Sequence, residues 1–174
     1  EAHIITKPVG RNTAPAISLA MAYIKMQGAA DSETVFISPA DHLIKPVAEF
    51  RKTVAGAEAL AKDGKIVTFG IVPNKPETGY GYIKTAYKIN SNAYAVEAFK
   101  EKPDEQTAAE YVKAGCYYWN SGMFMFSLQT MEAELKAHAQ EIYAAYTCGY
   151  KAMLADFEKL PDISIDYAVA EKSA

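Results

Sequence analysis

The sequence is poor in features that mark several classes of protein. Its two cysteines, Cys116 and Cys148, form no CxxC pair, so neither a disulfide framework nor a cysteine metal site is indicated. No apolar run approaches the roughly 20 residues that a membrane-spanning helix needs. The 18 basic and 21 acidic residues are intermixed and give a formal net charge of −3, which argues against a protein that binds nucleic acid or membrane surfaces. A reducing, cytoplasmic setting is therefore the default expectation.

Several common catalytic motifs are missing as well. The sequence contains no GxGxxG or GxxxxGK[ST] phosphate loop and no GxSxG nucleophile elbow. Its three histidines are not spaced as metal ligands.

What is present predicts an α/β fold. The 174 residues, half of them hydrophobic, suffice for one domain with its own core, which we expect to span residues 1–174. Hydrophobic patterns and turn residues predict strands at residues 4–6, 34–38, 66–71, 80–87, 93–99 and 123–126. Helices are expected at residues 12–28, 47–63, 107–113, 128–146 and 151–158, with a last one after Ser164. This alternation favours a mainly parallel, Rossmann-like sheet with an antiparallel insertion at residues 79–99.

Two carboxylates are candidate metal ligands. Asp41 follows a buried strand, at the sheet edge where ligands of open α/β sheets bind, and its oxygens suit Mg²⁺. Asp41 could equally cap a turn. Asp166 lies in the first turn of a predicted helix, where it could simply complement the helix dipole. Two aspartates far apart in sequence can nevertheless meet at one metal ion.

Several residues at strand ends and in loops are candidate ligand-binding residues, and each also has a purely structural interpretation. Gly81 lies at the start of a predicted strand, where a glycine often marks a backbone that a ligand approaches closely. Alternatively, it belongs to an ordinary turn. Glu101 could accept from sugar hydroxyls and Lys102 could meet a phosphate, unless both are a solvated strand end. Asn120 carries both a donor and an acceptor, as recognition of a diol requires. Alternatively, its segment is an ordinary turn in which Trp119 is packed. Residues 7–13, between a strand and a helix, could offer backbone N–H groups to an anion or a base, or be an ordinary capped loop.

Read in order, these segments resemble one family over almost the whole chain. The segments are residues 8–17 (PVGRNTAPAI), 38–42 (SPADH), 76–83 (PETGYGYI), 99–103 (FKEKP), 119–124 (WNSGMF) and 164–169 (SIDYAV). The pattern is similar to mannose-1-phosphate guanylyltransferase, or GDP-mannose pyrophosphorylase, in the bacterial form often fused to mannose-6-phosphate isomerase. The resemblance implies the nucleotide-diphospho-sugar transferase fold. It also implies the reaction of GTP with mannose 1-phosphate that yields GDP-mannose and pyrophosphate.

The resemblance also assigns roles to residues. Asp41 and Asp166 would hold a catalytic Mg²⁺, and Lys102 would act in catalysis by facing the phosphate. The residues that would line the mannose 1-phosphate site are Gly81, Glu101, Lys102, Asn120 and Gly122. Those that would contribute to the guanine nucleotide site are Pro8, Asn12, Thr13 and Ala14. No nucleic-acid or membrane partner is implied, and a homo-oligomer is an open alternative.

The sequence departs from the family pattern in three places. The Gly-rich signature GGxGxRLxPLxxxxPK is absent, which predicts a fragment that lacks the family's first βαβ unit and is inactive or nearly so alone. Lys7 stands where Glu is common and cannot accept from guanine N–H groups, while Ala170 replaces the usual Met. Two alternatives follow: a nucleotidyltransferase that uses another nucleotide or sugar 1-phosphate, and a non-catalytic module that binds sugar nucleotides.

Overall fold

The computed structural model describes residues 2–173, so Glu1 and Ala174, which the expected single domain included, lie outside the described residues. The chain divides into two compact units. The helical unit comprises the chain up to Val35, the short segment Gly64–Ile66 and the chain from Phe126 onward. The sheet unit comprises Phe36–Asp63 and Val67–Met125. Each unit has its own buried core.

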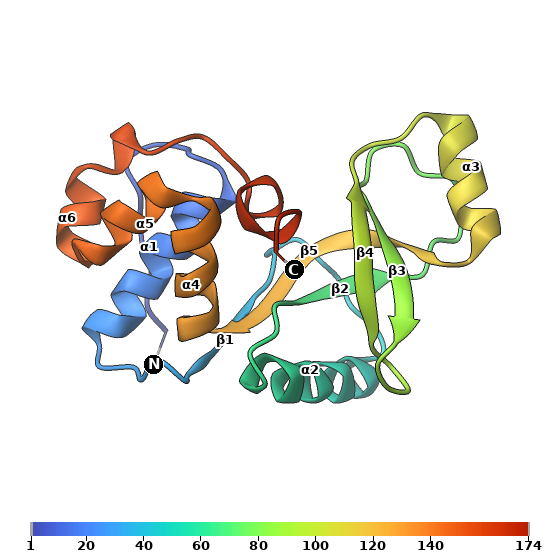
Figure 1. Ribbon diagram of the computed structural model, residues 1–174, viewed down its shortest axis with the longest axis horizontal. Coiled ribbons are helices and arrows are strands. Elements are labelled where there is room, and N and C mark those ends of the chain that lie inside the picture. Colours follow the sequence, from blue (N-terminus) through green and yellow to red (C-terminus); the bar gives the residue numbers. More distant parts are fainter. Residues whose placement is uncertain (1, 174) are drawn as a thin grey trace. The chain divides into compact units, whose positions relative to one another are not determined.

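The helical unit is built around α1 (Thr13–Met26), which packs against α5 (Gln140–Thr147) and α6 (Tyr150–Ala155) (Figure 1). The Asn12 side chain accepts from the Thr13 N–H and so begins α1 as the sequence predicts. Helix α4 (Leu128–His138) packs against α5 and against the short π-helical turn η2 (Asp166–Ala170), and a 3₁₀ turn, η1, spans Phe157–Lys159. The largest completely buried side chains of this unit are Leu19, Met21, Phe126, Leu128, Met131, Leu135, Ile142, Met153, Phe157 and Val169.

One predicted helix is in fact two. The single helix expected over residues 128–146 breaks at Ala139, whose φ of −141° and ψ of 59° are not helical. Neither Pro nor Gly marks the position, so intrinsic propensity gives no signal for it. Ile142 and Tyr146 of α5 are buried after the break, and α5 packs against both α1 and α4. We attribute the break to this tertiary packing, which overrides a preference of a few tenths of a kcal/mol per residue.

The sheet contains β1 (Thr34–Ile37), β2 (Val67–Ile71), β3 (Tyr82–Lys88), β4 (Tyr94–Lys100) and β5 (Tyr117–Ser127). Their order is β1-β5-β3-β4, and β2 also pairs with β5. Strand β5 is antiparallel to both β2 and β3, and β3 is antiparallel to β4. The α/β class is confirmed, and the hairpin β3–β4 is the expected antiparallel insertion. These three pairings do not show the expected parallel character.

Two strand predictions need correction. Residues 4–6 form no strand in the described chain, and Ile4 is 92% exposed. An apolar, β-branched composition favours a strand, but a strand also requires a neighbour to share its hydrogen bonds. Strand β5, in contrast, begins at Tyr117 and not at Met123, so the segment 119–122 lies within a strand instead of preceding one.

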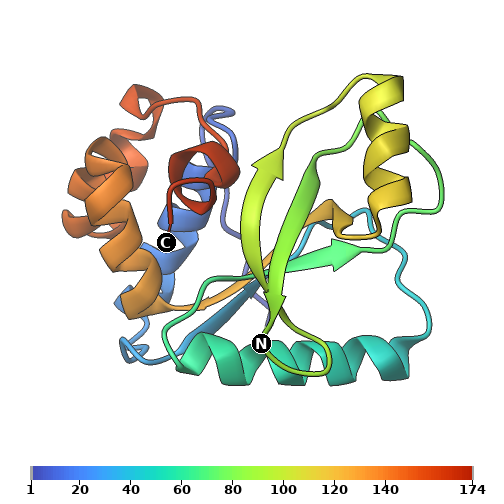
Figure 2. The same cartoon turned by 45° about the vertical axis from the view of Figure 1, so that its right-hand side comes forward.

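Two helices cover the sheet unit. Helix α2 (Val47–Lys62) contributes Ala57 and Ala61 to a core that contains Phe69, Met123 and Met125. Helix α3 (Glu105–Ala114) contributes Ala108 to a smaller core with Tyr82 and Trp119. Figure 2 shows α2 and α3 on opposite sides of this unit.

Candidate active site

The loop that precedes β3 is held in place by Glu77. Its carboxylate pairs with Lys75 at 2.8 Å and accepts from the Gly79 N–H at 3.2 Å, and its backbone carbonyl accepts from the Tyr82 hydroxyl at 2.9 Å. The hydrogen bond from Lys75 and the one from the Gly79 N–H lower the pKa of Glu77, and the Glu77 carboxylate raises the pKa of Lys75. These bonds fix the backbone that leads into Gly81.

Gly81 lies against two of the predicted sugar-site residues. A Cβ atom at position 81 would lie 2.9 Å from Glu101 Oε2 and 3.7 Å from the Asn120 Cβ. The Gly81 carbonyl accepts from the Asn120 N–H at 2.8 Å. Three residues separated by up to 39 positions in the sequence are therefore neighbours, and any side chain at position 81 would displace the carboxylate. This cluster of Gly81, Glu101 and Asn120 is called the sugar-site cluster below.

Gly122 and Lys102 extend the sugar-site cluster. Gly122 has a φ of 68°, a left-handed conformation that favours glycine, and its N–H donates to Asn120 Oδ1 at 3.0 Å. Lys102 also has a positive φ, of 35°, and its Nζ lies 3.4 Å from Glu101 Oε1. Both side chains of this ion pair are substantially exposed, so they can exchange their mutual contact for a ligand that carries phosphate and hydroxyl groups.

Asp41 belongs to the same unit as the sugar-site cluster. Its carboxylate is 88% exposed, with His42 Nε2 3.9 Å from Oδ1. Pro39, two residues earlier, is 3.6 Å from the position that a Cβ of Gly122 would take. The loop after β1 is thus adjacent to residue 122 in β5. An exposed carboxylate here fits a hard divalent cation that keeps water and phosphate oxygens as its other ligands.

The predicted nucleotide loop lies in the helical unit, beside the segment that carries Asp166. Thr13 Oγ1 accepts from the Ile165 N–H at 2.8 Å, and the Ala14 N–H donates to the Ile163 carbonyl at 3.1 Å. The sequence does not reveal this link, because it joins residues about 150 positions apart. Residue 166 is thereby held close to the start of α1.

Two of the N–H groups at the start of α1 already have partners. The Thr13 N–H is taken by the Asn12 side chain, and Ala14 is fully buried with its N–H bonded to Ile163. Pro8 has no N–H to offer. Asn12 adopts a φ of 60° and is exposed, so it presents its backbone and side chain to solvent. Of the four predicted nucleotide residues, Asn12 is therefore the one whose polar groups are best placed to meet a ligand.

The two predicted metal ligands, Asp41 and Asp166, belong to different units, and their convergence on one ion remains a prediction. Between residues 2 and 173, no group of three or more His, Cys, Asp or Glu side chains is arranged to hold a metal ion. Of the helices described, none combines the length and the apolar character required to cross a bilayer.

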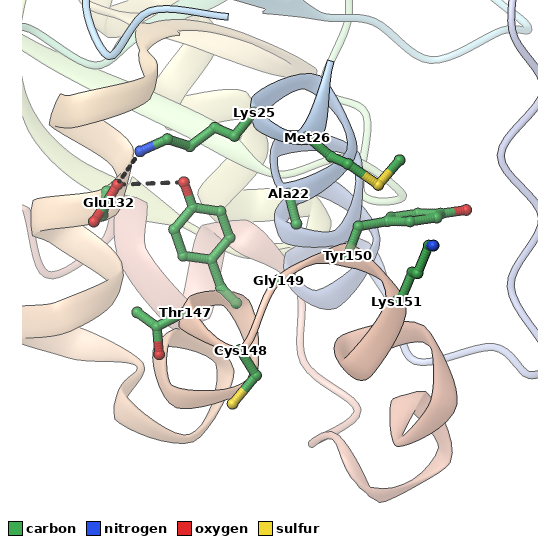
Figure 3. Close-up of a pocket in the computed structure, with 10 residues that line it drawn as sticks. Ala22, Lys25, Met26, Glu132, Thr147, Cys148, Gly149, Tyr150 and Lys151 are labelled. Carbon is green, nitrogen blue, oxygen red and sulfur yellow. Dashed lines mark hydrogen bonds and ion pairs between the residues drawn. The ribbon is translucent and has the colours of Figure 1, made fainter. Parts of the chain in front are cut away.

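The helical unit also contains an open pocket of about 600 Å³, which none of the predicted site residues lines (Figure 3). In its wall Glu132 Oε2 accepts from Lys25 at 3.1 Å and from the Tyr146 hydroxyl at 3.3 Å, and Lys25 also pairs with Asp31 at 2.6 Å. Burial and the nearby carboxylate of Glu132 raise the pKa of Tyr146 to about 12, and the carboxylate of Asp31 raises the pKa of Lys25. This network ties α1 to α4 and α5.

Comparison with known proteins gives the family. The sequence model described as nucleotidyl transferase matches residues 1–161. The mannose-1-phosphate guanylyltransferase RfbM of Salmonella typhimurium is 47% identical over 97% of this chain, and a mannose-1-phosphate guanylyltransferase of Escherichia coli is 43% identical over 99%. These matches cover 37% and 39% of the relatives, so the chain spans less than two fifths of their length.

A solved structure agrees with the sequence comparisons. A protein of Thermus thermophilus named mannose-1-phosphate geranyltransferase superposes with a TM-score of 0.89 at 34% identity, over 98% of this chain and 50% of that one. The family model runs through both compact units and includes the loop before α1, the sugar-site cluster and Asp41. The chain belongs to the nucleotidyl transferase family.

Proposed function

We propose that this chain is part of a mannose-1-phosphate guanylyltransferase, which joins GTP and mannose 1-phosphate into GDP-mannose and releases pyrophosphate. The observation that carries the proposal is the sugar-site cluster, in which a glycine leaves room for a carboxylate beside an amide. Such a set of donors and acceptors suits the hydroxyl groups of a hexose. The names of the relatives above support mannose as that hexose and guanosine as the nucleoside.

In the proposed reaction, an oxygen of the sugar phosphate attacks the α-phosphorus of GTP. A new P–O bond forms, and the bond to the β,γ-pyrophosphate breaks with its electron pair on the leaving oxygen. The phosphate of mannose 1-phosphate is largely a dianion at neutral pH, so no general base is required. The protein's task is to bring two polyanions together in line.

Each residue then has a physical role. The Glu101 carboxylate accepts from sugar hydroxyls, and the Asn120 amide donates to them. Gly81 admits the ring, and Lys102 neutralises charge on the sugar phosphate. Asp41 and Asp166 would hold Mg²⁺, which supplies charge neutralisation at the phosphates when it is bound. Asn12 contributes to the nucleotide side.

The test is pyrophosphate release by the protein in its natural length, with GTP, mannose 1-phosphate and Mg²⁺. We expect release only when both substrates are present, and Glu101→Gln to raise the KM for mannose 1-phosphate while leaving that for GTP unchanged. Glu105→Gln, an exposed carboxylate at the start of α3, is the matched control. Release without mannose 1-phosphate, or equal effects of both variants, would contradict the proposal.

Lys7 supports a second candidate, a transferase for another nucleotide. A lysine cannot accept from the N–H groups of guanine. A competition series with GTP, UTP, dTTP and ATP separates the two, since a guanylyltransferase is inhibited little by the other three. Binding of GDP-mannose with no pyrophosphate release under any combination would favour the non-catalytic module instead.

A further inference from the structure

Strand β5 contains an irregularity at the centre of the predicted sugar site. Thr68 of β2 pairs with Phe124, but Gly70, two residues later, pairs with Asn120, four residues earlier on β5. Strand β5 therefore accommodates two additional residues and bulges over positions 121–123, with Gly122 in the left-handed conformation. Such a bulge removes backbone groups from the regular ladder and leaves them in need of other partners.

Ser121 supplies those partners. Its side chain is buried, with 6% exposure, and its hydroxyl donates to the Phe69 carbonyl at 2.6 Å while accepting from the Met123 N–H at 3.2 Å. A hydroxyl is the smallest side-chain group that can do both. Ser121 thus links β5 to β2 where the ladder is interrupted, and its bond with the Met123 N–H joins two residues within the bulge.

The bulge in turn sets the position of Asn120. The Asn120 N–H donates to the Gly81 carbonyl, and Asn120 Oδ1 accepts from the Gly122 N–H. Asn120 and Gly122 flank Ser121 directly, so a change in the bulge moves both. Because the Asn120 Cβ lies 3.7 Å from the position of a Cβ on Gly81, the geometry of the whole sugar-site cluster depends on this bulge.

We propose that Ser121 is a positioning residue for the sugar phosphate: it touches no substrate, and it holds the bulge that places Asn120 beside Gly81 and Glu101. This inference rests on the proposed function for its substrate. The bonds that it invokes are nevertheless measurable without any substrate, so the two can fail separately.

Ser121→Ala leaves the Phe69 carbonyl and the Met123 N–H without their partner and changes no atom that would contact a ligand. We expect the KM for mannose 1-phosphate to rise roughly tenfold, with the KM for GTP within about twofold of the unaltered protein. Ser127→Ala is the matched control. Ser127 is a second buried serine of β5, at 1% exposure, and its hydroxyl accepts from the Thr130 N–H at 3.2 Å to cap α4.

Amide hydrogen exchange supplies the readout that needs no substrate. In Ser121→Ala we expect faster exchange at Gly122 and Met123 and unchanged exchange at Thr130, and in Ser127→Ala the reverse. Unchanged exchange at Gly122 and Met123 would overturn the proposal. So would faster exchange accompanied by equal changes in both KM values, since that result describes a purely structural serine.

If the unaltered protein releases no pyrophosphate with GTP and mannose 1-phosphate, the proposed function fails. The exchange experiment then decides whether Ser121 holds the bulge. Binding of mannose 1-phosphate alone, followed by the chemical shift of the Asn120 side-chain amide, decides whether the bulge serves a sugar phosphate. If mannose 1-phosphate no longer changes the chemical shift of this amide in Ser121→Ala but still changes it in Ser127→Ala, the proposal is supported. Equal changes of the chemical shift in both variants overturn it.

Discussion

The substitution Gly81→Ala tests the sugar-site cluster most directly. The new Cβ would lie 2.9 Å from Glu101 Oε2, whereas ordinary van der Waals contacts are 3.4–4 Å. The carboxylate must therefore retreat by about 0.5 Å or more, enough to weaken a hydrogen bond between the carboxylate and a sugar hydroxyl. Gly81 does not have a positive φ, so alanine introduces a clash at this position and no backbone strain.

The magnitude follows from the group that is displaced. A hydrogen bond to a charged group contributes about 1.5–3 kcal/mol, so losing most of one weakens sugar binding by roughly 10- to 100-fold. The substitution should have little effect on folding, because the displaced atom is the end of the flexible Glu101 side chain, which is 42% exposed. We expect the free energy of unfolding to change by less than about 0.5 kcal/mol, as for ordinary surface substitutions.

Gly70→Ala provides the contrast. Its Cβ would lie 2.7 Å from the Tyr118 Cβ, an atom bonded to the backbone of the neighbouring strand that cannot retreat without moving β5. We expect a loss of roughly 1–3 kcal/mol in the free energy of unfolding, as for overpacked sites. The two variants therefore separate binding from stability.

The assay combines urea unfolding with the KM for mannose 1-phosphate in pyrophosphate release. Gly81→Ala should raise this KM with stability retained, and Gly70→Ala should lower stability. An unaltered KM in Gly81→Ala, measured on a fully folded sample, would refute the idea that Glu101 contacts the sugar.

Three other predictions concern the Mg²⁺ dependence of pyrophosphate release, the stability of the fold at high pH and its stability at low pH. Asp166→Asn should raise the Mg²⁺ concentration for half-maximal pyrophosphate release at least roughly tenfold, and its exposed neighbour Asp162→Asn should not; equal effects would remove residue 166 from the metal site. Because the pKa of Tyr146 is raised to about 12 in the folded protein, its contribution to stability is complete below the ordinary value of about 10 and is lost as pH rises toward 12. Tyr146→Phe should flatten that alkaline loss in urea unfolding, and an unchanged profile would contradict the reasoning. The pKa of Asp104 is lowered chiefly by the Thr107 N–H that it caps, so Asp104→Ala should destabilise the protein at pH 7 but not near pH 2; equal destabilisation at both pH values would show that the carboxylate charge is irrelevant.

Much of the local structure could be read from the sequence because it depends on neighbouring residues. Asn12 begins α1 through a hydrogen bond to the next residue, and Gly115 ends α3 with a φ of 70°. The pattern of apolar residues located α2 and β2 to within about a residue at each end. The family resemblance also selected Gly81, Glu101 and Asn120, which the fold brings together.

Other features depend on partners far away in the sequence and could not be predicted. The helix break at Ala139 has no Pro or Gly to announce it, since the preference for two helices comes from packing against α1. Strand β5 pairs antiparallel with β2 and β3, although the alternation of strands and helices favours parallel neighbours. Residues 4–6 have strand composition and no strand, because hydrogen bonds to a neighbouring strand decide that state.

The amino-acid sequence is thus enough to identify the available chemical groups and the caps and apolar patterns of elements such as α1, α2 and β2. Which of those groups can meet a ligand depends on the packing of each unit. In the folded protein the N–H groups of Thr13 and Ala14 are hydrogen-bonded, whereas Asn12 is exposed. The Ser121 hydroxyl bonds to the Phe69 carbonyl at the bulge of β5. The physical reason is that caps and turns form within a few residues of chain, whereas the partner of a buried polar group is chosen by the packing of the whole unit.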